Sequence, residues 1–158
     1  MNIDNINFNN IKFSNIYSNN NSKYALSYYG SKNLELTLLI PNFRIYELTK
    51  SDNVYFCKFS IDKNTYKCLL NLEKHVIDYI KKNNFINLKN HNISIKDLFF
   101  SNLEKDSDKY FLNISIDNNL YQCLNKDINY NGKIKIIGIW IYEQLYGISY
   151  QLISYLNH

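Results

Sequence analysis

The chain has 158 residues, of which 46% are hydrophobic and 16% aromatic, so it is too apolar for a disordered chain and long enough to bury a core. Eighteen Lys and Arg residues against fourteen Asp and Glu residues give a formal net charge of +4, which excludes a strongly basic, histone-like protein. We therefore predict a single domain over residues 1–158.

The N-terminal third of the sequence predicts a weak strand followed by regular strands. Residues 1–22 hold short apolar segments separated by Asn and Ser, which is typical of a weakly ordered N-terminal strand or arm. Residues 23–30 and the alternating residues 34–38 predict a hairpin. The second strand then meets the only proline, Pro41, which strands tolerate at an edge or a break. Beyond it, residues 43–46 resume an extended pattern.

A change of period separates the third strand from the main helix. Residues 54–61 predict the strand, and residues 62–64 can cap the helix that follows. From Thr65 to about residue 82 the apolar side chains recur at helical spacing, which predicts an amphipathic helix with its core-facing stripe formed by Leu69, Leu72, Val76 and Ile80.

The second half of the chain returns to strands. Between residues 84 and 108 we expect a short strand at 93–95, a short helix at 96–103 and a solvated loop at 104–108. Three strands follow at 110–116, 133–142 and 146–152. In the last one the apolar face changes near Leu152, which predicts a β-bulge there.

These elements indicate an α+β, mostly β fold. A five-stranded antiparallel barrel with one main helix after the third strand is an OB-like arrangement, and it is the fold we predict. A β-sandwich with a covering helix is the alternative.

Neither catalytic nor metal chemistry is indicated by the spacing of reactive residues. No Cys-x-x-Cys pair, histidine cluster, glycine-rich phosphate loop or Gly-x-Ser-x-Gly motif is present. We therefore predict no enzyme, no catalytic residue, no metal and no cofactor. The three cysteines are interpreted as small buried hydrophobic residues, namely Cys57, Cys68 and Cys123.

The sequence also predicts no membrane-spanning segment and no secretory signal. The most apolar stretch, residues 134–156, contains Lys135 and Glu143 and so falls short of the roughly 18 to 20 apolar residues of a spanning helix. The first residues lack a basic segment followed by an apolar block. We expect an intracellular protein that is neither secreted nor bound to a membrane.

Basic residues alternate with aromatic ones on the predicted strands, as in proteins that bind single-stranded nucleic acid with a cationic groove and stacking side chains. Arg44 is the only arginine, and its guanidinium can stack on a ring or contact a phosphate through two hydrogen bonds. For any single aromatic residue, a place in the core is the alternative. One side of the predicted groove consists of Phe43, Arg44, Tyr46 and Lys58, and the other of Lys133, Lys135, Trp140 and Tyr142.

The C-terminal segments 133–141 and 146–152 resemble the closing hairpin of the OB-fold single-stranded-DNA-binding proteins of large DNA viruses and phages. In that family an aliphatic-Trp strand turns into a strand with the pattern Tyr/Phe-Gly-aliphatic-Ser/Thr, and the upstream elements follow in a similar order. The resemblance implies a protein that coats single-stranded DNA in viral replication, recombination or repair, in the host cytoplasm or nucleus. Replication proteins and a second copy of the chain are the further partners it suggests.

A second hypothesis from a different class stays open. Tyrosine-rich strands at a sheet edge can bind another protein, which would make the chain a non-catalytic structural or adaptor protein.

Overall fold

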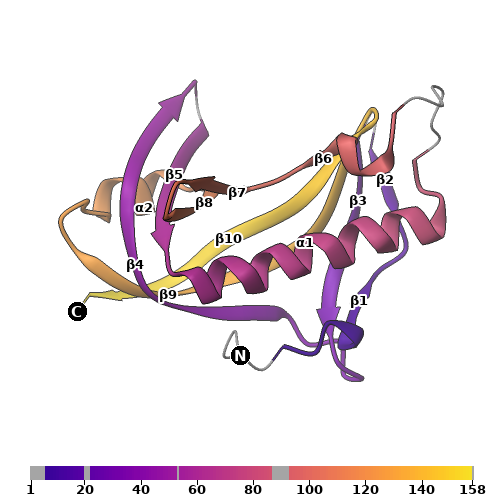
Figure 1. Cartoon of the computed structure of the whole chain (residues 1–158), viewed down its shortest axis with the longest axis horizontal. Helices are drawn as coiled ribbons and strands as arrows, with labels where there is room; N and C mark the ends of the chain where they lie inside the picture. The colour runs from indigo at the N-terminus through magenta and orange to yellow at the C-terminus, as the bar shows by residue number, and fades with distance from the viewer. Residues whose placement is uncertain (1–5, 20–21, 53, 87–92, 158) are drawn as a thin grey trace.

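Strands dominate the chain, and one long helix interrupts them (Figure 1). This computed structural model describes residues 6–19, 22–52, 54–86 and 93–157. In chain order its elements are the 3₁₀ helix η2 (Phe8–Asn10), β1 (Ile11–Phe13), β2 (Tyr17–Asn19), β3 (Ser22–Tyr29), β4 (Leu36–Ser51), β5 (Val54–Ile61), α1 (Lys63–Asn83), the 3₁₀ helix η3 (Ile95–Leu98), β6 (Phe99–Phe100), β7 (Leu103–Asp106), β8 (Lys109–Ile116), α2 (Asn118–Cys123), β9 (Asn129–Tyr142) and β10 (Leu145–Asn157).

The long strand β9 organises the sheet. Along one edge it pairs antiparallel with β10. Along its other edge it pairs first with β4, over residues 129–136, and then with β3, over residues 138–142. The second half of β4 leaves β9 and pairs with β5, which in turn pairs with β8, and β8 with β7. Hydrogen-bonded ladders thus connect ten strands into one sheet.

Two irregularities in β4 allow it to pair with β9 in its first half and with β5 in its second half. The register shifts between Ile40 and Phe43, around Pro41, and again between Ile45 and Glu47, around Tyr46. Proline has no N–H to donate, so it is tolerated where the ladder is interrupted. Bulges bend a strand and increase its twist. The sheet curls until β8 and β10 pack against each other, but no ladder joins these two strands in the described residues, so the sheet is not closed.

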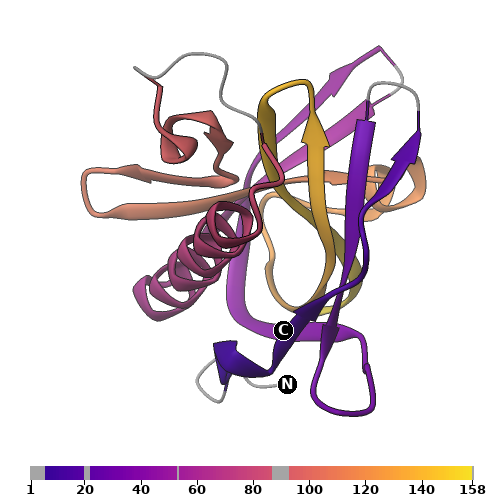
Figure 2. The same cartoon turned by 90° about the vertical axis from the view of Figure 1, so that its right-hand side faces the viewer.

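Helix α1 covers the concave, core-facing side of the sheet. Its N-cap is Asp62, whose carboxylate accepts hydrogen bonds from the backbone N–H groups of Asn64 and Thr65. Its predicted apolar stripe is at most 1% exposed and belongs to the same core as the inward-facing residues of β4, β9 and β10. Figures 1 and 2 show α1 lying on one side of the β9–β10 pair.

Several expectations are confirmed. The fold is mostly β with antiparallel pairing and one main helix, and β5 occupies the predicted residues 54–61. The helix matches the expected span within two residues at its N-terminus, and a register shift between Leu152 and Ser154 is the expected bulge. A closed barrel of five strands is not found, because the sheet has ten strands and is open. It is also a single connected sheet, unlike the two packed sheets of a sandwich.

Other expectations are wrong for reasons of pairing. The predicted hairpin of residues 23–30 and 34–38 reduces to one bridge between Tyr29 and Leu34, because β3 and β4 both run antiparallel to β9 and follow its edge one after the other. Residues 104–108 are exposed, as expected, but they are part of the β7–β8 hairpin and not a loop, with Ser107 at positive φ in the turn.

The short elements also differ from their predictions. The segment 93–95 is not a strand, and the helix expected at 96–103 is the single 3₁₀ turn η3 followed by β6. Of the N-terminal arm, β1 and β2 are strands, while residues 1–5 and 20–21 lie outside the described residues. Only one cysteine, Cys57, is fully buried, whereas Cys123 is exposed.

Candidate nucleic-acid interface

The side of the sheet opposite the core, here called the outer face, carries most of the predicted binding residues. On β9 the core-facing positions are even-numbered up to Ile136 and odd-numbered from Ile139. The parity changes because Gly138 pairs with Ser149 and Ile136 with Tyr150, which leaves Ile137 as an extra residue. This bulge brings four predicted residues onto the same face, namely Lys133, Lys135, Trp140 and Tyr142.

Aromatic side chains form a line across the outer face, which we call the aromatic row. Tyr17 of β2 pairs with Tyr24 of β3, which pairs with Trp140 of β9, and Gly147 of β10 separates Trp140 from Phe100 of β6. The rings of Tyr17 and Tyr24 are stacked with centroids 5.4 Å apart, and those of Phe100 and Trp140 lie 6.1 Å apart. The two tyrosines are 48% and 44% exposed and Phe100 is 58% exposed. The row therefore presents ring surface to solvent.

Gly147 determines how the indole of Trp140 lies. A Cβ atom at Gly147 would come within 2.7 Å of Cζ2 and 2.9 Å of Cε2 of Trp140, so the indole packs directly on the backbone of β10. Any side chain at this position would lift the ring from the strand. Trp140 is thus half-buried and supported from below, as a stacking surface needs to be.

Arg44 lies in a second part of the outer face, in a pocket of about 450 Å³ between β4, β8 and the segment after α2, called the Arg44 pocket. Its Nε donates to the carbonyl oxygen of Lys126 at 3.0 Å, and its Nη2 lies 4.0 Å from a carboxylate oxygen of Asp127. Three cations and one carboxylate line the pocket, so its net charge is positive. The full lining is Arg44, Ile45, Tyr46, Ser60, Lys109, Phe111, Lys126 and Asp127.

Tyr46 and Lys58 cover a buried ring beside this pocket. Tyr46 is 52% exposed, and its ring centroid lies 4.7 Å from that of Phe111. The Nζ of Lys58 lies 4.6 Å from the Phe111 centroid and 2.7 Å from Oε1 of Glu104. This hydrogen bond lowers the pKa of the Glu104 carboxyl. Because Glu104 already neutralises the ammonium group of Lys58, we expect Lys58 to contact a phosphate less readily than Arg44 does.

A second pocket of the outer face adjoins the aromatic row, because Phe100 and Trp140 line it. We call the gap between β8 and β10 the seam. It contains a pocket of about 320 Å³, here called the seam pocket, which is lined by Phe56 of β5 on one side and by Phe100 and Trp140 on the other. Phe56 is 42% exposed and lies on the same face of β5 as Lys58. The outer face is thus continuous from Tyr17 to the Arg44 pocket.

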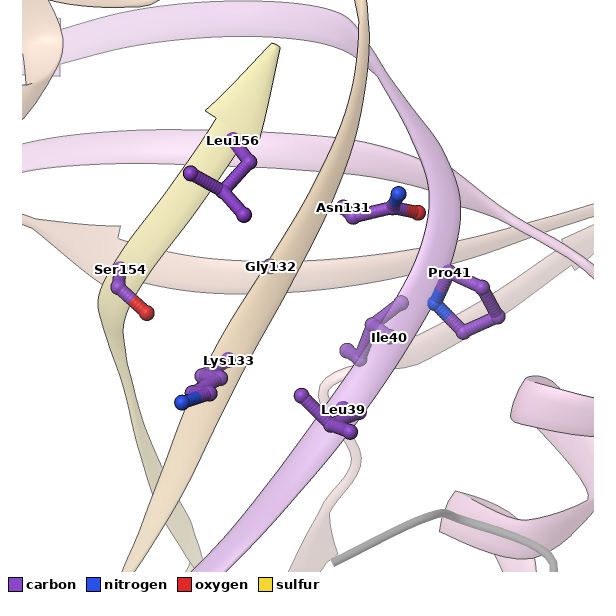
Figure 3. A pocket seen from close by; sticks show the side chains of 8 residues that line it. All are labelled: Leu39, Ile40, Pro41, Asn131, Gly132, Lys133, Ser154 and Leu156. Atoms are coloured by element: carbon purple, nitrogen blue, oxygen red, sulfur yellow. The ribbon is translucent and has the colours of Figure 1, made fainter. Parts of the chain in front are cut away.

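The remaining predicted cations lie further along β9. Figure 3 shows Lys133 between Leu39 and Ser154, its register partners on β4 and β10, in an open apolar pocket of about 340 Å³. Lys135 forms an ion pair with Glu35. Of these two lysines, Lys133 is therefore the better placed to contact a phosphate.

Phe43 is not part of the interface. It is 2% exposed, and its ring packs 4.8 Å from that of Phe59 and 5.6 Å from that of Tyr130. Because β4 is extended here, Phe43 faces the core while its neighbour Arg44 faces outward. The prediction that Phe43 lines the groove is corrected accordingly.

The structure groups the predicted residues and adds others. Arg44, Tyr46 and Lys58 lie together, and Trp140 and Tyr142 lie together on the outer face of β9. The predicted groove did not include the remaining members of the outer face, because their proximity depends on pairing between distant strands. These residues are Tyr17, Tyr24, Phe56, Phe100, Lys109 and Lys126.

Comparisons with known proteins give no further guide, since the chain matches no protein-family model and no curated protein. The described residues contain no cluster of His, Cys, Asp or Glu that could hold a metal ion. No helix in the described part of the chain is long and apolar enough to cross a membrane.

Proposed function

We propose that the protein binds single-stranded DNA, without sequence preference, on its outer face. The observation that carries this proposal is the aromatic row, in which rings from four strands, three of them exposed and that of Trp140 half-buried, lie in register across one sheet. Aromatic side chains stack on any base, so such a row suits binding without sequence preference.

Cations flank the rings where a phosphate backbone needs them. Arg44, Lys109 and Lys126 converge on the Arg44 pocket, and Lys133 lies on the outer face of β9, beside Ser154 of β10. Within the described residues neither Lys109 nor Lys126 forms an ion pair. In the proposed complex the bases stack on the aromatic row and in the seam pocket, and these cations neutralise phosphates.

The order of the strands supports an OB-like arrangement within the larger sheet. β4 lies between β5 and β9, β5 leads to β8, β9 leads to β10, and β8 packs against β10 across the seam. An OB-fold is a partly open five-stranded barrel that binds oligonucleotides on its second and third strands and the adjoining loops. In this arrangement β5 and β8 take those two places, with α1 between them and not after the third strand as predicted, and β5 carries Phe56 and Lys58 on its outer face.

Fluorescence anisotropy with a labelled oligo-dT of about thirty nucleotides tests the proposal. We expect tight binding at low salt, weaker binding as salt rises and little competition from a duplex of equal length, since paired bases offer no exposed faces to the row. A folded protein that binds no oligonucleotide at low salt, or that prefers the duplex, contradicts the proposal.

Arg44→Ala is expected to weaken binding and to lower its salt dependence. Each phosphate contact to a single strand contributes about 0.7 to the slope of log affinity against log salt, so the slope should fall by roughly that amount. Lys74→Ala, at an exposed position on α1, removes the same charge elsewhere and should leave the slope unchanged. Equal slopes for Arg44→Ala and Lys74→Ala would remove the Arg44 pocket from the interface.

A protein partner is the second candidate, and the pocket in Figure 3 favours it. Leu39 and Leu156 line this pocket and are 41% and 74% exposed, and Ile153 on the same strand as Leu156 is 44% exposed. If no oligonucleotide binds, analytical ultracentrifugation should test whether the protein self-associates through this apolar end of β10. Leu156→Lys is expected to abolish the self-association.

A further inference from the structure

The exposed face of α1 carries a second basic surface, which the proposed function does not use. Five lysines lie on this helix and all are exposed, namely Lys63, Lys67, Lys74, Lys81 and Lys82. None of them forms an ion pair within the described residues. The whole chain has eighteen Lys and Arg residues and a net charge of only +4, so this one helix concentrates more than a quarter of the basic residues.

Four of these lysines form a straight line, here called the lysine row. At 3.6 residues per turn, the row members lie within about 40° of one another around the helix axis, and at a rise of 1.5 Å per residue the row is about 27 Å long. The row consists of Lys63, Lys67, Lys74 and Lys81. Because α1 packs its apolar stripe against the core-facing side of the sheet, the row points away from the outer face (Figure 2).

The stability of α1 does not account for the N-terminal half of the row. A lysine in the last turn, such as Lys81, interacts favourably with the negative end of the helix dipole. Lys63 lies in the first turn, which contains no acidic residue and where the dipole disfavours a cation. Lys63 and Lys67 are also like charges four residues apart, which weakens a helix. An anionic ligand on the row offsets this repulsion.

The chemistry of this face selects among anionic partners. Exposed side chains beside the row include the amides of Asn64 and Asn71, and no large hydrophobic residue of α1 is exposed. A protein interface has an apolar centre, and a helix that binds a membrane buries its apolar face in the lipid, whereas that of α1 lies in the core. Single strands are held by rings that stack on bases, which this face lacks. A duplex instead presents one phosphate per about 1.7 Å, which suits a surface of lysines alone.

We propose that the lysine row binds the phosphate backbone of double-stranded DNA, without sequence preference and independently of the outer face. This binding does not rest on the proposed function. One consequence does rest on it: a bound duplex leaves the outer face free for a single strand. The junction of a duplex with a single strand then binds more tightly than either part, because the second contact is intramolecular.

Anisotropy of a labelled blunt duplex of about twenty base pairs, longer than the row, tests the proposal at several salt concentrations. Each phosphate that a lysine neutralises on a duplex contributes about 0.9 to the slope of log affinity against log salt. Lys74→Ala should therefore lower the slope by about 0.9, and Lys67→Ala combined with it by about 1.8. Lys32→Ala removes the same charge at an exposed position between β3 and β4 and should leave the slope unchanged.

Asp78→Asn is expected to act in the opposite direction. Asp78 is an exposed carboxylate on the same side of α1, between Lys74 and Lys81, and it forms no ion pair within the described residues. Removing its charge removes a repulsion from the phosphates, so the duplex affinity should rise several-fold at low salt. A folding defect does not raise affinity, so this variant separates binding from stability. An unchanged or lower affinity contradicts the proposal.

A duplex with a dT overhang of about thirty nucleotides tests the link to the proposed function. We expect it to bind about tenfold or more tightly than the blunt duplex or oligo-dT alone. Both Lys74→Ala and Arg44→Ala should weaken this complex, since each removes a cation from one of the two surfaces.

The outcomes separate the two proposals. Absence of duplex binding at low salt overturns the lysine row, whatever oligo-dT does, and row-dependent sedimentation with vesicles of about one third phosphatidylserine would then assign the row to lipid headgroups. A duplex slope that falls with Arg44→Ala and not with Lys74→Ala places the duplex on the outer face and also overturns the row. Row-dependent duplex binding without oligo-dT binding supports the row and overturns the proposed function. Binding of both without a gain at the junction overturns only their link.

Discussion

Trp140→Ala is expected to lower the affinity for oligo-dT by about ten- to hundredfold, since each base stacked on an aromatic side chain contributes about 1 to 3 kcal/mol. Trp140 lies in the middle of the aromatic row, on the backbone of Gly147 and next to the seam pocket, so its loss interrupts the row and enlarges the pocket. Anisotropy titrations at one salt concentration measure the change.

Tyr66→Ala is the control for this substitution. Tyr66 is also half-buried, and its ring packs 4.8 Å from that of Tyr110, but it lies on α1, away from the outer face. It should lower stability without changing affinity. If both variants are folded by circular dichroism and bind oligo-dT equally well, the aromatic row is not the stacking surface.

Gly138→Ala is expected to destabilise the protein by about 3 kcal/mol or more, because a Cβ atom there would lie 1.9 Å from the carbonyl oxygen of Ala25. Gly138 pairs with Leu26 at the point where β9 exchanges β3 for β4, and the two backbones approach too closely for any side chain. The contacted atom belongs to a backbone, so it cannot move aside as a side chain could. Urea denaturation followed by tryptophan fluorescence measures the loss.

Gly30→Ala is the control for this substitution, because it introduces backbone strain without a steric clash. Gly30 has φ +73°, but no atom lies within 4 Å of the added Cβ, so only the left-handed conformation is penalised, by about 1 to 2 kcal/mol. If Gly138→Ala unfolds at the same urea concentration as Gly30→Ala, the prediction is wrong. β3 and β9 could then move apart to accommodate a side chain without loss of stability.

Features that depend on local pattern could be predicted from the sequence. The apolar stripe of α1 is buried as its 3.6-residue period requires, and Asp62 caps the helix as its side chain allows. Strand alternation also places Arg44 and Tyr46 outward together. The same alternation would have placed Phe43 in the core, and the prediction that grouped it with Arg44 gave the residue types more weight than the period.

Features that depend on pairing between distant segments could not be predicted. Lys135 and Trp140 have opposite parity on one strand, and they share a face only because a bulge at Ile137 reverses the alternation. The sequence around Tyr17 and Phe100 does not indicate that these residues lie in one row with Trp140. Their positions depend on the register of β2 with β3 and of β6 with β10. The hairpin expected at residues 23–38 failed for the same reason, since a strand 100 residues later offers both segments a better edge.

The position of β9 in the chain has a consequence for the order of folding. β3 pairs with β1 and β2 nearby in the chain, but the edge of β3 that meets β9, and the first half of β4, find their ladder partner only in residues 129–142, so most of this pairing closes loops of about a hundred residues. Such distant contacts lose chain entropy before they gain stabilisation, which makes folding slow compared with helical proteins of equal length. During synthesis these edges of β3 and β4 stay unpaired until the last quarter of the chain has left the ribosome.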